Sequence, residues 1–443
     1  MCSIRPRASC LNRRVPKPAG ASPHPSPADF GFETSHRLEN GGSPGSDGRP
    51  LGRAGVIRTP HGEIRTPAFI PVGTKATVKA MLPETVTALG GQAVLANAYH
   101  LFLQPGADIV DEAGGLGRFM NWDGPTFTDS GGFQVMSLGV GFKKVISMDE
   151  NAYQSDEVIA KNKERLAHVD EDGVSFKSFL NGDVHRFTPE VSMDIQHQLG
   201  ADIIFAFDEC TTLMNTRAYQ EDSVARTERW AVRCLDEHAR QTEARAHRPY
   251  QALFGVVQGA QYEDLRRAAA RGLAALTGEE ASGQRFDGFG IGGALEKSQL
   301  GTIVGWVSDE LPDDKPRHLL GISEPEDLFA SIAAGADTFD CVAPSRQARG
   351  GTLYSSRGRI NAKSAGQRRR FEPIDPDCDC HTCANYTAAY LHHLFKAKEM
   401  LASTLATIHN ERYIVRLVDR IRESILDDSF TELREETLGR LRR

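Results

Sequence analysis

Short apolar runs recur along the chain from about residue 54, and longer segments with helical periodicity separate them. A continuous apolar run of this length is typical of a parallel strand that is buried on both faces. The runs span 68–72, 93–97, 126–128, 203–207, 252–257, 289–291, 318–320 and 338–339. Because about eight strand–helix repeats follow one another, the pattern predicts an α/β fold, a (β/α)8 TIM barrel.

Three regions fall outside this repeat. Residues 1–50 are rich in Pro, Gly and Ser, which predicts a disordered N-terminal tail because such a composition buries little apolar surface. The predicted barrel covers 51–371, opens with a hairpin near 55–67 and carries a polar insertion at 140–172. Residues 372–443 are expected to form a separate, mostly helical C-terminal subdomain.

Composition narrows the class of protein. With 40% hydrophobic and 25% charged residues, and no apolar run long enough to cross a bilayer, the sequence predicts a globular protein without a membrane span. The first residues do not have the pattern of a secretory signal. The eight cysteines are therefore expected in a reducing, cytoplasmic compartment.

The charge is unevenly distributed along the chain. A net charge of −7 argues weakly against nucleic-acid binding. Residues 341–371, however, contain Arg346 and Arg349 among several basic residues, and no Asp or Glu. An isolated basic run is usually a solvated surface. This one follows a candidate catalytic carboxylate, which favours a surface that contacts phosphates.

Chemically distinctive residues stand at or just past the carboxyl ends of the predicted strands. They are Asp129, Asp208, Gln258, Gly292, Gly293, Leu320 and Asp340. TIM-barrel enzymes build the active site at this end of the strands. The pattern therefore predicts one pocket to which several loops contribute.

Two carboxylates facing one pocket suit chemistry at a glycosidic bond. Asp129 lies in TDSGGFQ, where two glycines let the backbone approach a ligand, and Asp340 lies in FDCVAP. One carboxylate can attack an anomeric carbon while the other transfers protons, so that base exchange proceeds through two displacements. Taken alone, either aspartate is explained at least as well as a helix cap.

Asp208 and Gln258 offer groups that complement the edge of a guanine. An ionised Asp208 can accept from N1 and the exocyclic amine, and Gln258 can both donate and accept at the remaining edge. The backbone at Gly292 and Gly293 can supply an amide to a carbonyl oxygen. Taken alone, Gln258 is more simply explained by ordinary hydrogen bonding within a loop.

A sharper signal is the motif Cys378-Asp-Cys380-His-Thr-Cys383. Three thiolates and one imidazole form a closed tetrahedral zinc site, which is structural because no ligand position is left for water. Spacing alone leaves several histidines as candidates for the fourth ligand, although His381 is sterically awkward because it lies inside the thiol loop. These histidines are His381, His392, His393 and His409.

The motifs, taken together, resemble those of the bacterial-type tRNA-guanine transglycosylases. They recur in order over about residues 54–430 as FMNWDGPTFTDSGGFQVMSL, DIIFAFDEC, VVQG, FDG followed by GG, LPDDKPRHLLGI, FDCVAPSRQAR, CDCHTC and HLFKAKEMLASTLATIHNE. The resemblance implies a barrel with a zinc-binding insertion and C-terminal helices, usually in a homodimer. It also implies that guanine at the wobble position of tRNAs with a G-U-N anticodon is exchanged for a 7-deazaguanine, a step toward queuosine.

The resemblance also implies a role for each matching residue. Asp340 would be the nucleophile on the ribose C1′, and Asp129 the general acid/base. Arg346 and Arg349 would contact the flanking anticodon nucleotides. An extruded purine would be recognised or sandwiched by Asp208, Gln258, Gly293, Ser130, Phe133 and Leu320. One structural zinc ion per subunit would be held by Cys378, Cys380, Cys383 and His409.

The sequence departs from many bacterial members after Gly293, where Ala-Leu-Glu-Lys-Ser replaces Leu-Ala-Val-Gly-Glu. This loop adjoins the 7-substituent of the incoming base, so 7-aminomethyl-7-deazaguanine and queuine both stay candidates; the other motifs favour the first. Three other functions fit less well. A non-catalytic partner subunit would lose a catalytic aspartate, a glycoside hydrolase would need neither the thiol motif nor the basic stretch, and an archaeal-type enzyme would carry further RNA-binding domains.

Overall fold

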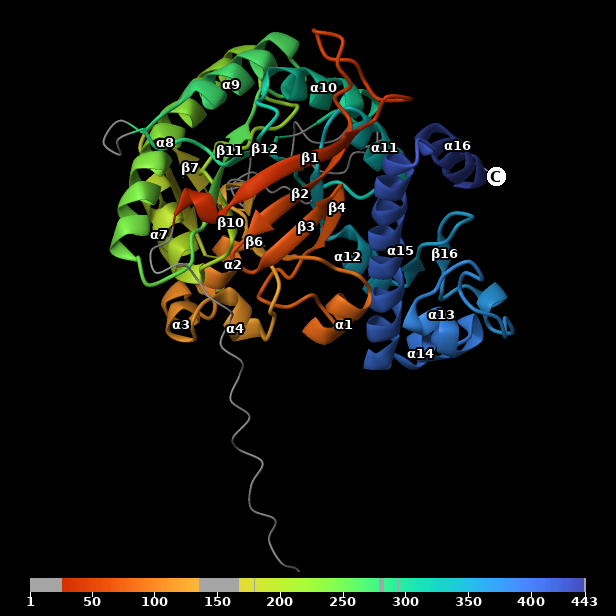
Figure 1. The fold of residues 1–443 in the computed structure, drawn as a ribbon. Coiled ribbons are helices and arrows are strands. Elements are labelled where there is room, and N and C mark those ends of the chain that lie inside the picture. The colour runs from red at the N-terminus through yellow and green to blue at the C-terminus, as the bar shows by residue number, and fades with distance from the viewer. Residues whose placement is uncertain (1–25, 135–166, 179, 279–282, 294, 442–443) are drawn as a thin grey trace, which may run out of the picture.

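Eight parallel strands form a closed barrel in the computed structural model, which describes residues 26–134, 167–178, 180–278, 283–293 and 295–441 (Figure 1). A bridge between Val72 and Leu95 closes the ring. In order around the barrel the strands are β5 (Val94–Ala96), β6 (Thr126–Thr128), β10 (Ile203–Phe205), β11 (Ala252–Val257), β12 (Gly288–Ile291), β13 (Arg317–Leu319), β14 (Thr338–Cys341) and β4 (Ala68–Pro71). Each apolar run identified in the sequence falls on one of these strands, so the predicted barrel is confirmed.

Helices connect the strands and surround the barrel. They are α1 (Pro83–Ala88), α2 (Ala98–Leu103), α3 (Ala107–Glu112), α4 (Leu116–Met120), α7 (Pro189–Leu199), α8 (Arg217–Ala244), α9 (Glu263–Ala275), α10 (Leu300–Glu310), α11 (Pro325–Ala333) and α12 (Ala343–Gly350). Local sequence sets the ends of α7. The Thr188 side chain accepts from the amide of Val191, and Gly200 ends the helix at a φ of +67°.

Large aromatic side chains fill the barrel interior. Phe127, Phe205 and Phe254 belong to one buried cluster inside the strands. Gly288 and Gly290 of β12 make room for them, because a Cβ at these positions would lie 2.5 Å from the Phe254 ring and 3.0 Å from the Phe205 ring. The barrel is therefore a packed core, and space for chemistry exists only at its ends.

An antiparallel three-stranded sheet covers the amino-terminal end of the barrel (Figure 1). It consists of β1 (Gly31–Arg37), β2 (Arg53–Thr59) and β3 (Gly62–Thr66), and the predicted hairpin is confirmed as β2–β3. The predicted disorder of residues 1–50 is wrong for 26–50. β1 is stabilised by its hydrogen bonds to β2, and Leu38 is fully buried. Residues 1–25 lie outside the described residues.

A second antiparallel sheet precedes α7. It consists of β7 (Ala167–Val169), β8 (Val174–Lys177) and β9 (Val184–Phe187). Most of the insertion expected at 140–172 lies outside the described residues; its last part, 167–172, forms β7 and the turn into β8. Phe176 and Phe187 pack into the main hydrophobic core, which anchors this sheet to the barrel domain.

After α12 the chain enters a C-terminal subdomain beside the barrel (Figure 1). Its elements are β15 (Thr352–Leu353), β16 (Ile360–Asn361), α13 (His381–Asn385), α14 (Ala388–Ala397), α15 (Met400–Leu426) and α16 (Phe430–Leu441). A small core that includes Leu353, Leu391 and Leu405 begins before the expected boundary at 372. α15 packs on α12 and β4 and joins the subdomain to the barrel. None of the helices in the described ranges is long and apolar enough to cross a bilayer.

Candidate active site and metal centre

Asp129 directly follows β6 and is held by three donors. Asn97 Nδ2 and Gln134 Nε2 donate to its Oδ2, the latter at 2.8 Å, and the amide of Ala98 donates to Oδ1 at 2.8 Å. Burial raises the pKa of Asp129 to about 6; the hydrogen bonds oppose this shift, and the charge of Asp340 adds to it. A carboxyl group with this pKa can hold or release a proton near neutral pH, as a general acid/base must.

Asp340 lies in β14 and faces the same end of the barrel. Its side chain is 14% exposed. Its Oδ1 accepts from the amide of Gly321 at 3.1 Å and lies 3.1 Å from His318 Nε2. Because the charge of Asp340 acts on the pKa of Asp129, the two carboxylates lie within electrostatic range of each other at one mouth of the barrel.

Asp208 follows β10 and forms a second cluster beside this pair. Ser130 Oγ donates to its Oδ1 at 3.2 Å, and Gln258 Nε2 donates to its Oδ2 at 2.6 Å. Burial raises the pKa of Asp208 to about 6, although both hydrogen bonds lower it. Gln258 Oε1 has no hydrogen-bond partner among the described residues. Gly293 has a φ of +88°, and a Cβ there would lie 2.5 Å from this oxygen, so only glycine fits without a shift.

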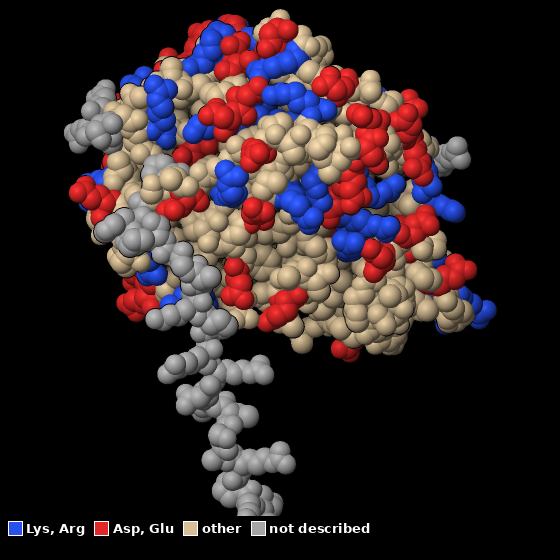
Figure 2. Space-filling model, in the orientation of Figure 1, with Lys and Arg blue, Asp and Glu red and all other residues tan. Residues whose placement is uncertain are grey.

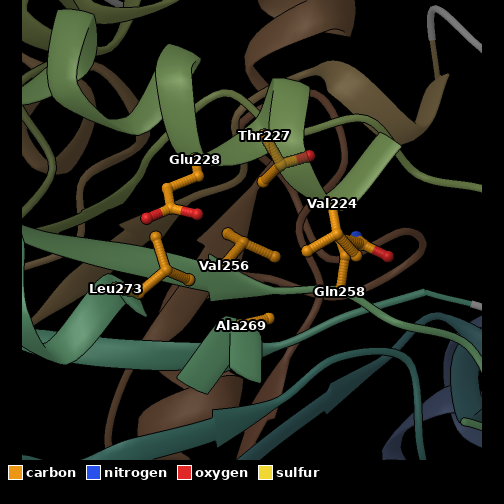
Figure 3. A pocket seen from close by; sticks show the side chains of 7 residues that line it. All are labelled: Val224, Thr227, Glu228, Val256, Gln258, Ala269 and Leu273. Carbon is orange, nitrogen blue, oxygen red and sulfur yellow. The ribbon is translucent and has the colours of Figure 1, made fainter. Parts of the chain in front are cut away.

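The two residues expected to sandwich a base lie in different environments. The Leu320 side chain is 3.7 Å from where a Cβ of Gly292 would stand, and therefore lies beside the cluster around Asp208. Phe133 is 43% exposed. A small cavity adjoins Gln258 between α8, α9 and the end of β11 (Figure 3). It is lined by Val224, Thr227, Glu228, Val256, Gln258, Ala269 and Leu273. Because neither catalytic candidate lines it, this cavity borders the candidate pocket and does not form it.

The basic stretch begins in α12, directly after β14. Arg346 is exposed, whereas Arg349 is half-buried and lies close enough to Glu411 of α15 for that carboxylate to act on its pKa. Arg368 and Arg369 are exposed, and neither forms an ion pair within the described residues. The structure thus leaves Arg346 and this later arginine pair more accessible to phosphates than Arg349.

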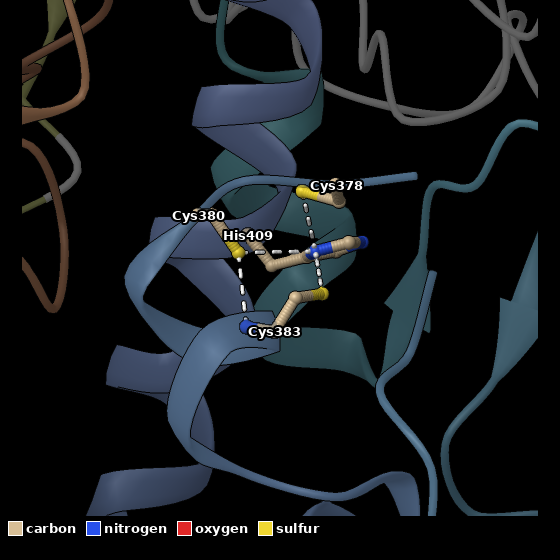
Figure 4. Close-up of side chains that lie close together, drawn as sticks. All are labelled: Cys378, Cys380, Cys383 and His409. Carbon is tan, nitrogen blue, oxygen red and sulfur yellow. Dashed lines mark hydrogen bonds between the residues drawn. The ribbon is translucent and has the colours of Figure 1, made fainter. Parts of the chain in front are cut away.

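Cys378, Cys380, Cys383 and His409 converge in the C-terminal subdomain (Figure 4). Their candidate ligand atoms all lie within 4.8 Å of one another, and His409 Nδ1 is 3.6, 3.5 and 3.3 Å from the three Sγ atoms in chain order. His409 Nε2 lies 2.6 Å from the carbonyl oxygen of Tyr354, to which it can donate, so that Nδ1 is left to bind a metal. This group of side chains can hold a metal ion in a tetrahedral arrangement.

The other candidate histidines lie elsewhere. His381 is exposed and contacts Asn385, and His392 Nδ1 lies 2.9 Å from the carbonyl oxygen of Ala362. His393 is exposed on α14. Of the four histidines that spacing leaves open, the structure therefore brings His409 to the thiols.

The sequence reasoning missed five residues that contact the two carboxylates: Asn97, Ala98 and Gln134 at Asp129, and His318 and Gly321 at Asp340. Asn97 and Gln134 carried a signal, since the first ends an apolar run and the second belongs to the TDSGGFQ motif. His318 and Gly321 reach Asp340 because β13 and β14 are neighbours, and His318 is paired with Thr338. This pairing is not visible in a linear motif.

Comparison with known proteins gives relatives over most of the chain. The family model described as "Queuine tRNA-ribosyltransferase" matches residues 47–443. A curated protein of that name from Caldanaerobacter subterraneus subsp. tengcongensis is 44% identical over 395 residues, which are 88% of this chain and 95% of the relative. Those from Herpetosiphon aurantiacus and Bacillus subtilis are 45% and 43% identical over 398 and 391 residues, covering 89% and 88% of this chain and 91% and 92% of the relatives.

Proposed function

We propose a wobble-guanine exchange reaction from one premise: this chain belongs to the queuine tRNA-ribosyltransferase family and is a transferase that acts on guanine in tRNA. The proposed reaction replaces guanine at the wobble position of tRNAs with a G-U-N anticodon by a 7-deazaguanine. The ribose is held covalently by Asp340 between the two half-reactions. The observation that carries the proposal is the pair of carboxylates, Asp129 and Asp340, that lie at one mouth of the barrel, near enough for the charge of one to act on the other.

Two displacements at C1′ complete the exchange. In the first, a carboxylate oxygen of Asp340 attacks C1′, the C1′–N9 bond breaks, and the leaving guanine takes a proton from Asp129. In the second, Asp129 accepts the N9 proton of the incoming base. N9 then attacks C1′, and the C1′–O bond to Asp340 breaks. A pKa of about 6 suits Asp129 to both directions of proton transfer.

The cluster around Asp208 is proposed to bind the base. Asp208 would exchange its present hydrogen bonds for those of guanine N1 and the exocyclic amine, with Ser130 beside it. Gln258 and the amide of Gly293 would meet the purine carbonyl. Phe133 and Leu320 would stack on the two faces of the ring.

The tRNA would lie across the basic stretch, with Arg346 and Arg349 at the nucleotides that flank the exchanged base. A homodimer is part of the proposal. Tyr390 on α14 is 39% exposed and stacks on Tyr386, and Met400 at the start of α15 is 89% exposed. Exposed apolar side chains of this size suit a protein interface. Sedimentation of Tyr390→Asp would show a monomer if this surface joins two copies.

Zinc is the proposed metal, because three thiolates and an imidazole favour it and its tetrahedral geometry. Bound there, it would act structurally and fix the subdomain against the barrel; such sites contribute roughly 10–16 kcal/mol in small peptides. Metal analysis should give one zinc per chain, and Cys383→Ser should lose it. A different metal, or none in freshly purified protein, would contradict the assignment. Since tRNA is the substrate, the proposed compartment is the cytoplasm.

Labelled guanine provides the test of the reaction. It should enter unmodified G-U-N tRNA without ATP, and Asp340→Asn should abolish this exchange. Offering 7-aminomethyl-7-deazaguanine and queuine separately identifies the incoming base. The first is the expected substrate, and exclusive use of queuine would overturn that choice. Full exchange by the Asp340→Asn variant would overturn the mechanism.

A further inference from the structure

We propose that His318 is the positioning residue for Asp340: its Nε2–H holds Oδ1 of the carboxylate so that Oδ2 is presented to the ribose. This inference rests on the proposed function, in which Asp340 attacks C1′. It adds a residue that the sequence motifs did not single out as part of the site.

The imidazole is fixed inside the barrel and has little freedom to move. His318 is 0% exposed. Its ring centroid lies 5.5 Å from that of Phe127 and 5.2 Å from that of Phe205. Packed aromatic neighbours on two strands therefore set the plane of the ring. The side chain thus meets Asp340 in one orientation.

The carboxylate of Asp340 sets the tautomer of His318, because it can only accept, and the Thr338 hydroxyl completes the arrangement by donating to the other ring nitrogen. His318 Nδ1 lies 2.9 Å from Thr338 Oγ1, and its Nε2 lies 3.1 Å from Asp340 Oδ1. The Thr338 hydroxyl has no other hydrogen-bond partner within the described chain, so its proton is free to point at Nδ1. An Nδ1 that accepts leaves the proton on Nε2, and an ionised carboxylate can only accept it.

The two carboxylate oxygens of Asp340 differ in their hydrogen-bond contacts. Oδ1 receives both Gly321 N–H and His318 Nε2–H. No donor to Oδ2 exists among the described residues, so that oxygen keeps its lone pairs for attack. Once Oδ2 is esterified to C1′, Oδ1 becomes the ester carbonyl oxygen and can still accept both bonds. The same arrangement therefore serves both displacements without a rearrangement of the protein.

A strand-bridging histidine with only a structural role would give the same contacts, so the test must separate stability from turnover. His318→Phe keeps a flat ring between Phe127 and Phe205 and removes both ring nitrogens. His318→Gln retains an N–H donor near the position of Nε2. Thr338→Val keeps the imidazole and removes only the hydroxyl that donates to Nδ1.

Single-turnover formation of the covalent tRNA adduct is the readout, alongside kcat, KM for tRNA and the melting temperature. His318→Phe should slow adduct formation and lower kcat by about 100-fold, the scale of a misplaced reacting group, with KM within about twofold. The rate of adduct formation in His318→Gln should be within about tenfold of the wild-type rate. In Thr338→Val this rate should fall by about threefold to tenfold.

The outcomes separate this inference from the proposed reaction. If wild-type protein forms no adduct, the proposed reaction fails whatever His318 does. If wild type forms the adduct, and a folded His318→Phe variant does so at the wild-type rate, only the positioning role is overturned. Should His318→Phe not fold, Thr338→Val decides: a wild-type rate of adduct formation in that variant would overturn the role.

Discussion

The two ends of strand β14 carry aspartates in opposite surroundings. Asp337, just before the strand, is 0% exposed and binds Arg53 through Nε at 2.9 Å and Nη2 at 2.7 Å. Asp340, within the strand, meets only His318 and the amide of Gly321 in the described structure. One carboxylate is neutralised by a buried arginine, whereas the other has no cation of fixed charge.

This contrast extends around the barrel. At the amino-terminal end, each of three buried aspartates accepts from the backbone amide of a neighbouring strand, at 2.7–3.0 Å. These pairs are Asp202 with Thr126, Asp287 with Leu253, and Asp337 with Arg317. At the carboxyl end, Asp129, Asp208 and Asp340 form no ion pair with Lys or Arg of the described residues. The carboxylates at the amino-terminal end thus fix the register of the strands. Those at the carboxyl end stay available for chemistry, and burying them without a cationic partner costs free energy.

Replacing the proposed acid/base should give the largest effect. Asp129→Asn cannot transfer a proton, so the exchange rate should fall by about 1,000-fold. Asp287→Asn is the matched control, because burial also raises the pKa of Asp287 to about 6, but at the opposite end of the barrel. Its exchange rate per folded molecule should stay within about twofold of wild type. A large loss in both variants would erase the functional distinction between the ends.

Asp337→Asn should reduce stability, whereas the replacement of Asp129 should reduce activity. It leaves the Arg53 guanidinium buried without its carboxylate, so the free energy of unfolding should fall by about 3–5 kcal/mol in urea titrations. Asp340→Asn, on the same strand, should change that free energy by no more than about 1 kcal/mol. If the two variants were equally destabilised, the carboxyl end would also be held together by its aspartate.

The pH dependence of stability should distinguish the ends more finely. The pKa values of Asp129 and Asp208 are raised from 3.8 to about 6, mainly by burial. Between these values the folded protein binds more protons than the unfolded chain, so these groups lower stability as pH rises through about 4–6. Relative to Asp129→Asn/Asp208→Asn, wild type should lose about 4–5 kcal/mol of unfolding free energy between pH 4 and pH 7. If the difference in unfolding free energy between wild type and the double variant stayed constant from pH 4 to pH 7, the burial of both ionised groups would be contradicted.

The smallest predicted difference concerns tRNA affinity. Figure 2 shows the face that carries β1–β3, where basic and acidic side chains are interspersed. Arg58 on that face is exposed and paired with Glu33, so Arg58→Ala should leave tRNA affinity unchanged. Arg346→Ala, beside the catalytic end, should weaken binding by about threefold to tenfold and reduce its salt dependence. Equal effects of both variants in filter binding would place the tRNA elsewhere.

The barrel could be predicted because its strands are buried on both faces. Runs such as 203–207 and 252–257 remain apolar throughout, and no neighbouring element is needed to recognise them. β1 could not be predicted in this way. Its sequence, GFETSHR, is largely polar and half-exposed, and the strand exists because β2 lies beside it. The sequence pattern therefore predicts which strands are buried, but it does not predict a strand that depends on pairing with another segment.

The same limit applied within the candidate site. Asp129, Asp208 and Asp340 were recognisable because strand ends mark the mouth of a barrel. Their surroundings were not recognisable, because the contact between His318 and Asp340 depends on the register of β13 against β14. The metal group was intermediate: the thiol spacing was evident, but only the fold of α15 brings His409 to them.

The most direct test of the account is to locate the covalent bond. Wild-type protein would be mixed with labelled G-U-N tRNA, quenched in denaturant and digested with protease and nuclease, and the modified peptide would be sequenced by mass spectrometry. The account predicts one ribose-linked peptide, modified at Asp340 and absent from Asp340→Asn. A ribose attached to Asp129 or Asp208, or exchange without any covalent species, would contradict it.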